Sequence, residues 1–381
     1  MENCRIMFWL RIAAALLFVS ARMRAEGEWQ VLHLEGRDYL SIDNVAKFYG
    51  FPGPVPPLSQ IPGASPLEPL TKKLRLDNGR QQLELTLNSR EVVLNGVKQW
   101  LSFPVAGIGE QMAISRLDLS KTLEPMLRPE LIRDLRPVQT VVLDPGHGGH
   151  DKGAVSIFGN EKDFALDVCQ RARPLLEAKG LRVVMTRDSD VFIPLEQRPH
   201  GANAIPNSIF VAMHFNFAPA NPIASGFEIF SITPRGAPST DENFLSTRDL
   251  RNEPGNATDA PSSALSASIY HAMLGNIPQF DRGIKHQRFA VIRLSTVPAV
   301  LIEGGFVTSA SEVRLIATPV WRQKLAEAIV AGIESYKDLA EHHLPPKTVA
   351  DYRRETAPGL AVAPTVVTNA TLANPAAPKN N

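Results

Sequence analysis

The chain has 381 residues, which is long for a single hydrophobic core and predicts two domains with extensions. Hydrophobic residues make up 44% and charged residues 21%, as in ordinary globular proteins, and the formal net charge is only +1. Because aromatic residues make up only 7% and no basic stripe lies among them, nucleic acid is excluded as an expected partner.

The first 25 residues have the features of a secretory signal peptide. Arg5 precedes an apolar run over residues 12–19 that is too short to span a bilayer, and small residues follow it as a cleavage site. We therefore expect residues 1–25 to be removed from an exported protein that has no stable membrane span. Of the two cysteines, Cys4 lies in this signal and Cys169 is left alone, which excludes an intramolecular disulfide.

Residues 28–130 predict a small α+β module. An alternating segment at 29–34, a short helix at 44–49 and hairpin strands around a turn at 77–79 follow one another, with a proline-rich loop over 51–69. The module has no clustered His, Cys or paired carboxylates, so we expect wall binding or spacing from it rather than catalysis. It is similar to the small domain at the N-terminus of some copper amine oxidases, although no copper ligand set is visible.

Over residues 138–340 strands and helices alternate. This predicts an α/β domain with a mainly parallel sheet covered by helices on both faces. Strands are expected at 140–143, 181–186, 208–213, 227–232 and 299–302, and helices at 161–179, 262–274 and 319–336. Functional sites in such sheets lie at the carboxyl ends of the strands. His147, His214 and Glu303 each follow a predicted strand, so we expect them at one edge of the sheet.

Two segments carry no clear regular pattern. Residues 341–381 are rich in Pro, Ala, Thr and Asn and cannot bury enough apolar area to offset chain entropy, so a disordered tail is expected. The polar segment from Thr233 to Pro261 is long for a loop inside a compact domain, and such loops are commonly functional. We expect it to border the cleft and control access to it.

Three side chains from separate segments form a candidate metal site. His147 lies on a glycine-rich turn, Glu161 opens a predicted helix, and His214 ends a strand. Two imidazoles and a carboxylate are a typical ligand set for a catalytic zinc ion, which keeps its fourth position open for water. Taken singly, each residue also has an explanation without a metal ion; Glu161, for example, would complement the helix dipole in the first turn. A late carboxylate, Glu303, either pairs with an arginine such as Arg187 or acts in catalysis. Together they favour a metal-dependent hydrolase.

Short motifs in this region occur in the order found in a known family. They are Asp144-Pro145-Gly146-His147-Gly148-Gly149, Glu161-Lys162-Asp163, Met213-His214-Phe215-Asn216 and Leu301-Ile302-Glu303-Gly304-Gly305. By these motifs residues 138–336, over half of the chain, resemble the zinc N-acetylmuramoyl-L-alanine amidases, which are bacterial cell-wall hydrolases. Any one motif alone is weak, but together they are specific.

The resemblance implies the chemistry of the site. One zinc ion per chain would be held by His147, Glu161 and His214. Asn216 would support the ligands, and Glu303 would be the general base that takes a proton from water and passes it to the departing amine. The implied substrate is peptidoglycan, cleaved between muramic acid and the first L-alanine, which places the protein in the periplasm or at the cell wall. The need for a protein activator stays open.

Two other functions stay open at this point. One is a catalytically silent peptidoglycan-binding protein that keeps the fold, and the other is a zinc peptidase that acts on a different wall amide. The retained ligands speak against the first, and the absence of a His-Glu-x-x-His motif disfavours a thermolysin-like protease. Glu228 is a rival acid near the cleft. The histidines expected to be structural or at the surface are His150, His200, His271 and His286.

Overall fold

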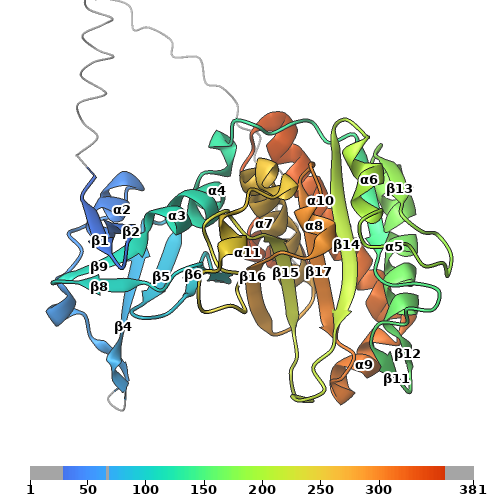
Figure 1. Cartoon of the computed structure of the whole chain (residues 1–381), viewed down its shortest axis with the longest axis horizontal. Coiled ribbons are helices and arrows are strands. Elements are labelled where there is room, and N and C mark those ends of the chain that lie inside the picture. The colour runs from blue at the N-terminus through green and yellow to red at the C-terminus, as the bar shows by residue number, and fades with distance from the viewer. Residues whose placement is uncertain (1–28, 66–67, 357–381) are drawn as a thin grey trace, which may run out of the picture.

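The structure, a computed structural model, describes residues 29–65 and 68–356 (Figure 1). The predicted signal peptide and residues 357–381 of the predicted tail lie outside these ranges. Within them, none of the helices combines the length and the hydrophobicity needed to cross a bilayer.

One sheet of eleven strands runs through most of the molecule, from the β13 side to the N-terminal hairpins (Figure 1). Its C-terminal strands are, in spatial order, β13 (Arg182–Met185), β10 (Thr140–Pro145), β14 (Ser208–Asn216), β17 (Ala299–Phe306), β15 (Phe227–Ile232) and β16 (Asp281–Gln287). The first four are parallel, β15 runs antiparallel to β17, and β16 is again parallel to β15. The mainly parallel α/β sheet is therefore confirmed, with one reversal between β17 and β15.

Helices cover both faces of this part of the sheet, as predicted. One face packs against the long helices α5 (Glu161–Ala178), α7 (Asp259–Asn276) and α10 (Pro319–His342). The other packs against the short helices α6 (Arg198–Asn203) and α8 (Ala290–Arg293). Every residue of β10 and β15 is buried, because strands covered on both faces send side chains into two cores. Polar side chains therefore gather where the strands end.

The N-terminal α+β part is present, and its strands divide between a small sheet of their own and the large sheet. Strands β1 (Val31–Leu34), β2 (Arg37–Ser41), β9 (Gln111–Ser115) and β8 (Ala106–Ile108) form a small sheet beside helix α2 (Ile42–Phe48). The large sheet is continued by β7 (Val97–Trp100), β6 (Glu91–Leu94), β5 (Gln82–Thr86), β4 (Glu68–Asp77) and β3 (Gly63–Ser65). The junction is a parallel pairing of β7 with β16, so backbone pairing crosses the predicted domain boundary. The sequence predicts a loop throughout residues 51–69. This prediction is wrong at Gly63–Ser65, which form β3.

The expected tail is also wrong in its described part. Helix α10 continues to His342, and α11 (Val349–Thr356) follows it and buries Val349 and Tyr352. Tyr352 packs closely against Gly275 of α7, where an added Cβ would lie 2.4 Å from the Cβ of Tyr352. Val349 and Tyr352 therefore hold α11 against the domain, although the overall composition of residues 341–381 is typical of disorder.

The segment from Thr233 to Pro261 is fixed and lies away from the cleft. A buried ion pair holds it, since Arg288 Nη1 lies 2.8 Å from Asp249 Oδ1. Arg90, from the N-terminal part, donates hydrogen bonds to its backbone carbonyl oxygens. None of its residues lines the cavity beside the candidate metal site. The expectation that this segment borders the cleft and controls access to it is therefore wrong.

Candidate metal centre

His147 is presented by a turn that starts where β10 ends. His147 has a positive φ of 60°, and Gly148 and Gly149 have φ values of 125° and 58°, a region of backbone space that glycine adopts readily and most other residues avoid. Gly146 meets a second requirement, because an added Cβ there would lie 2.3 Å from His214 Cε1. The glycine-rich motif therefore allows the two imidazoles to approach each other.

Two buried arginines hold this turn in place. Arg187 and Arg198 together donate to the backbone carbonyl oxygens of residues 145–147 at 2.7–3.0 Å. Arg198 also forms an ion pair of 2.9 Å with the fully buried carboxylate of Asp144. Within the described residues, neither arginine pairs with Glu303. The alternative that Glu303 is the ion-pair partner of Arg187 is therefore wrong.

Replacing Arg198 with methionine is expected to lower the free energy of unfolding by about 3–5 kcal/mol, because the change leaves the Asp144 carboxylate buried without its partner. Chemical denaturation measures this loss. The matched control is Arg173→Met on α5, whose partly exposed ion pair with Glu177 is expected to contribute at most about 1 kcal/mol. Equal losses in the two variants would contradict the role assigned to Arg198.

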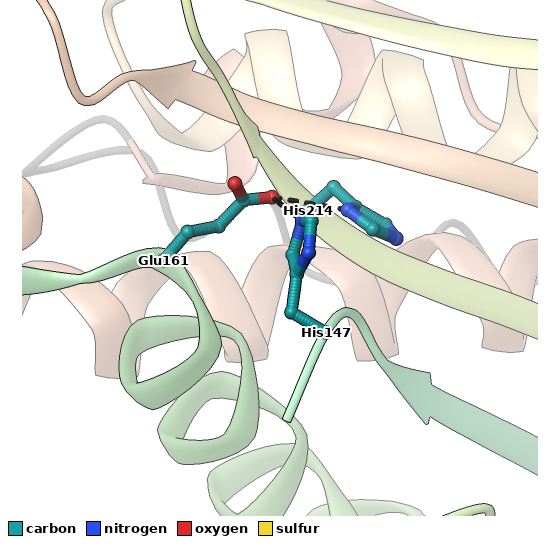
Figure 2. A group of neighbouring side chains, drawn as sticks. All are labelled: His147, Glu161 and His214. Carbon is teal, nitrogen blue, oxygen red and sulfur yellow. Dashed lines mark hydrogen bonds and ion pairs between the residues drawn. The ribbon is translucent and has the colours of Figure 1, made fainter. Parts of the chain in front are cut away.

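The structure brings His147, Glu161 and His214 together, and Figure 2 shows their side chains meeting from three separate elements. His147 Nε2 and His214 Nδ1 each lie 3.0 Å from Glu161 Oε1. Donor atoms around one tetrahedral zinc ion, with bonds of about 2.0–2.1 Å, lie about 3.3 Å apart. Both the chemistry and the spacing of this donor set therefore fit such an ion.

The carboxylate of Glu161 is fixed from two sides. It is buried in the first turn of α5, and the backbone N–H groups of Phe215 and Ala154 donate to Oε1 and Oε2 at 3.0 and 2.9 Å. Burial acts to raise the pKa of Glu161, but hydrogen bonds and charge interactions with His147 and His214 outweigh it and hold that pKa well below its usual range. Glu161 is therefore ionised and in position, which is the state that binds a cation.

Asp151, which the sequence did not single out, orients His147. Asp151 Oδ2 lies 2.9 Å from His147 Nδ1, while Oδ1 accepts from the backbone N–H of Gly153 at 3.1 Å. A carboxylate at Nδ1 leaves Nε2 available as the metal-binding atom. Burial acts to lower the pKa of His147, but Glu161 and Asp151 outweigh it and raise that pKa above its ordinary value.

Replacing Asp151 with alanine is expected to weaken metal binding by about 10- to 100-fold, because His147 loses the group that fixes its ring. Competition between the protein and a chelator of known affinity measures the change. Asp163→Ala is the matched control. This exposed carboxylate of the same region accepts a hydrogen bond from Asn160 and none from His147 or His214. An Asp151→Ala variant with the affinity of this control would show that the ring needs no such support.

Glu303 lies beside this cluster on β17. It is the register partner of His214 on the adjacent parallel strand β14, so the two side chains leave the sheet on the same face. Both line one cavity of about 270 Å³, together with His147 and Glu161. Glu303 Oε2 is buried and has no hydrogen-bond partner among the described residues. Burial, followed by the negative charges of Glu161 and Glu228, raises the pKa of Glu303 well above its ordinary value.

Glu228, the rival acid, is fully engaged in other contacts. Arg282 Nε lies 3.0 Å from its Oε2, and the ammonium of Lys285 contacts the same oxygen. Burial acts to raise the pKa of Glu228, but these two cations and Asn216 lower it below its ordinary value. Asn216 Nδ2 donates to Glu228 Oε1 at 2.6 Å, so the expectation that Asn216 supports a metal ligand is wrong. Glu228 is thus ionised and paired.

The other histidines singled out in the sequence lie elsewhere. The ring of His150 packs against Phe192, and His200 is exposed on α6. His271 contacts a backbone carbonyl oxygen, and burial lowers the pKa of His286 to about 4, which keeps it neutral. Among the described residues, His147, Glu161 and His214 form the one group of three such side chains close enough to hold a metal ion.

Comparison with known proteins gives a consistent result. A family model described as N-acetylmuramoyl-L-alanine amidase matches residues 141–335. The chain is 32% identical over 273 residues to N-acetylmuramoyl-L-alanine amidase AmiA of Escherichia coli K12, covering 66% of this chain and 92% of that protein. It is 31% identical over 224 residues to AmiC of Escherichia coli O6:H1, covering 53% of each. A solved amidase from Clostridium difficile 630 aligns at 32% identity with a TM-score of 0.45, over 53% of this chain and 98% of its own.

Proposed function

This chain belongs to the N-acetylmuramoyl-L-alanine amidase family, and we propose that it hydrolyses its peptidoglycan substrate with the help of a zinc ion held by His147, Glu161 and His214. The bond cleaved is the amide between the lactyl group of N-acetylmuramic acid and the first L-alanine of the stem peptide. The observation that carries the proposal is the approach of two imidazole nitrogens to one carboxylate oxygen at 3.0 Å, beside Glu303.

When bound, the ion supplies Lewis acidity, which polarises the scissile carbonyl and lowers the pKa of a water to about 7. The chain's own groups prepare this site in three ways. Glu161 brings one negative charge, Asp151 fixes the ring of His147, and Arg187 and Arg198 hold the turn. The ligands are therefore in place before a metal ion arrives, which keeps the cost of ordering them low.

Glu303 performs the proton transfer in this proposal. Its Oε2 is buried and free of other hydrogen bonds, so that atom can accept a proton from the attacking water and hold it. The same atom then delivers the proton to the nitrogen of the departing L-alanine, which leaves as a neutral amine. The raised pKa suits this role, because burial and the negative charges of Glu161 and Glu228 make the Glu303 carboxylate a stronger base toward water than an ordinary carboxylate.

The walls of the cavity suit the groups that flank the scissile bond. Leu195, Phe217 and Phe289 line it and are partly exposed. The lactyl group and L-alanine each present a methyl group, and apolar walls favour such groups over charged ones. Recognition of the sugar and of the rest of the peptide falls to the open surface around the cavity.

Analysis of digested muropeptides tests this proposal directly. Purified sacculi treated with the full chain and zinc are expected to release stem peptides with free L-alanine amino ends. Free amino ends on another residue would instead support the alternative of a zinc peptidase. We further propose that the protein acts after export, in the periplasm or at the cell wall, where N-terminal sequencing of the mature protein should find residues 1–25 removed.

A further inference from the structure

A row of side chains connects Glu303 with the N-terminal part of the chain. Glu303 on β17 is the register partner of Glu228 on the neighbouring strand β15. Glu228 in turn binds the two cations of β16, Arg282 and Lys285. Because β16 pairs with β7, this row continues from the candidate catalytic carboxylate to a strand contributed by the first hundred residues.

Trp100, the last residue of β7, holds the segment of β16 that carries the cations. Its Nε1–H donates to the backbone carbonyl oxygen of Arg282 at 3.0 Å. Its ring lies against Gly283, where φ is 97° and an added Cβ would lie 2.9 Å from Trp100 Cδ1. Lys285 Nζ lies 5.7 Å from the centroid of the same ring, within the range of a cation–π contact.

The pairing of β15 with β16 is irregular at this point, and the irregularity brings two cations of β16 to the carboxylate of Glu228. The register shifts between Phe227 and Ile229, so Arg282 and Gly283 both lie opposite Glu228, while Lys285 lies opposite Phe230 on the same face as Glu228. As a result Arg282 and Lys285 both reach the same oxygen of Glu228. A carboxylate that is only 6% exposed depends on such partners, since an unpaired buried charge is costly.

We propose that Lys285 and Trp100 are positioning residues for Glu303, which makes the N-terminal part of the chain a working part of the active site. Trp100 holds Lys285, Lys285 fixes Glu228, and Glu228 sets the place and the surroundings of the Glu303 carboxylate. The inference rests on the proposed function, because it takes Glu303 as the proton carrier. The wall-binding role expected for the N-terminal part stays a separate prediction.

Kinetics of the full chain on purified sacculi test this inference. Lys285→Met and Trp100→Leu are expected to lower kcat by about 10- to 100-fold, as losses of outer supporting contacts do. KM and the zinc content per chain should stay unchanged, because the loss concerns proton transfer rather than binding. Lys285→Arg keeps the charge and should recover most of kcat. Since Trp100 and Lys285 act on the same carboxylate, the double variant should lose less than the product of the two single losses.

Arg90→Met is the matched control for a general loosening of the junction. Arg90 also joins the N-terminal part to the rest, through backbone carbonyl oxygens of Ser239, Thr240 and Glu242, and none of its hydrogen bonds goes to a residue of β16. This variant is expected to lower Tm and to leave kcat unchanged. Should Lys285→Met not fold, Lys285→Gln, which keeps a polar side chain but removes the charge, gives the same test of kcat against KM.

The outcomes separate this inference from the proposed function. A wild-type kcat in Lys285→Met, or in Lys285→Gln where that variant replaces it, would overturn the inference. So would an equal fall of kcat in Arg90→Met. An active Glu303→Gln variant would overturn the proposed function itself. An inactive Glu303→Gln variant beside normal Lys285→Met and Trp100→Leu variants would remove only the positioning role.

Discussion

Glu303→Gln is expected to lower kcat for release of stem peptides by about a hundred- to ten-thousand-fold, the range that general acid–base catalysis contributes. Glutamine has nearly the same shape, but its amide oxygen does not take up a proton at neutral pH. Because Glu303 is not one of the three clustered side chains, the variant should still bind one zinc ion per chain. Turnover on purified sacculi and metal analysis of the same sample measure both quantities.

Glu327→Gln provides the matched control, since this glutamate is exposed on α10 and lies away from the cavity. It should turn over sacculi like the unchanged protein. Full activity in Glu303→Gln would show that another group moves the proton, and Glu228 would then be tested next. Loss of zinc together with activity would instead place Glu303 among the metal ligands.

Changes to the ligands themselves are expected to abolish activity and metal binding together. In His214→Ala one of three donors is missing, and Glu161 loses one of the two contacts that hold its carboxylate ionised. Zinc at 100 times its dissociation constant should stabilise the unchanged chain by about 2.7 kcal/mol, because only the folded state assembles the site. The variant should show no such gain under the same conditions, which thermal unfolding with and without zinc measures.

His200→Ala separates this effect from a general loss of histidine, because His200 is exposed on α6 and belongs to no cluster. It should keep both the stabilisation by zinc and the activity. A chelator should inactivate the unchanged protein, and added zinc should restore it. Stabilisation of His214→Ala by zinc to the same extent as the unchanged chain would mean that the ion binds elsewhere.

Much of the C-terminal fold follows from local patterns in the sequence. Apolar runs such as Val141–Leu143 and Ile209–Met213 mark strands buried on both faces, and β15 occurs at the predicted residues. Strand β16 could not be found in this way, because its sequence, Asp-Arg-Gly-Ile-Lys-His-Gln, shows neither an apolar run nor regular alternation. Its place depends on pairing with β15 and β7, which are distant in the chain.

The candidate site divides in the same way. His147, His214 and Glu303 could be placed at one edge because each comes directly after a predicted strand of a parallel sheet, although β14 and β17 extend far enough to include His214 and Glu303. The supporting groups carry no such signal. Asp151 looks like any acid in a turn, and Lys285 lies in the strand that the pattern does not reveal. Such residues act through contacts between distant segments, so only the folded chain identifies them.

The most direct test is a crystal structure of the full chain with zinc, with anomalous data collected at the zinc edge. One ion is expected, bonded to His147 Nε2, His214 Nδ1 and the carboxylate of Glu161 at about 2.0–2.1 Å, with Glu303 beside the open position. An ion held by other residues, or imidazoles of His147 and His214 that face separate pockets, would contradict the account.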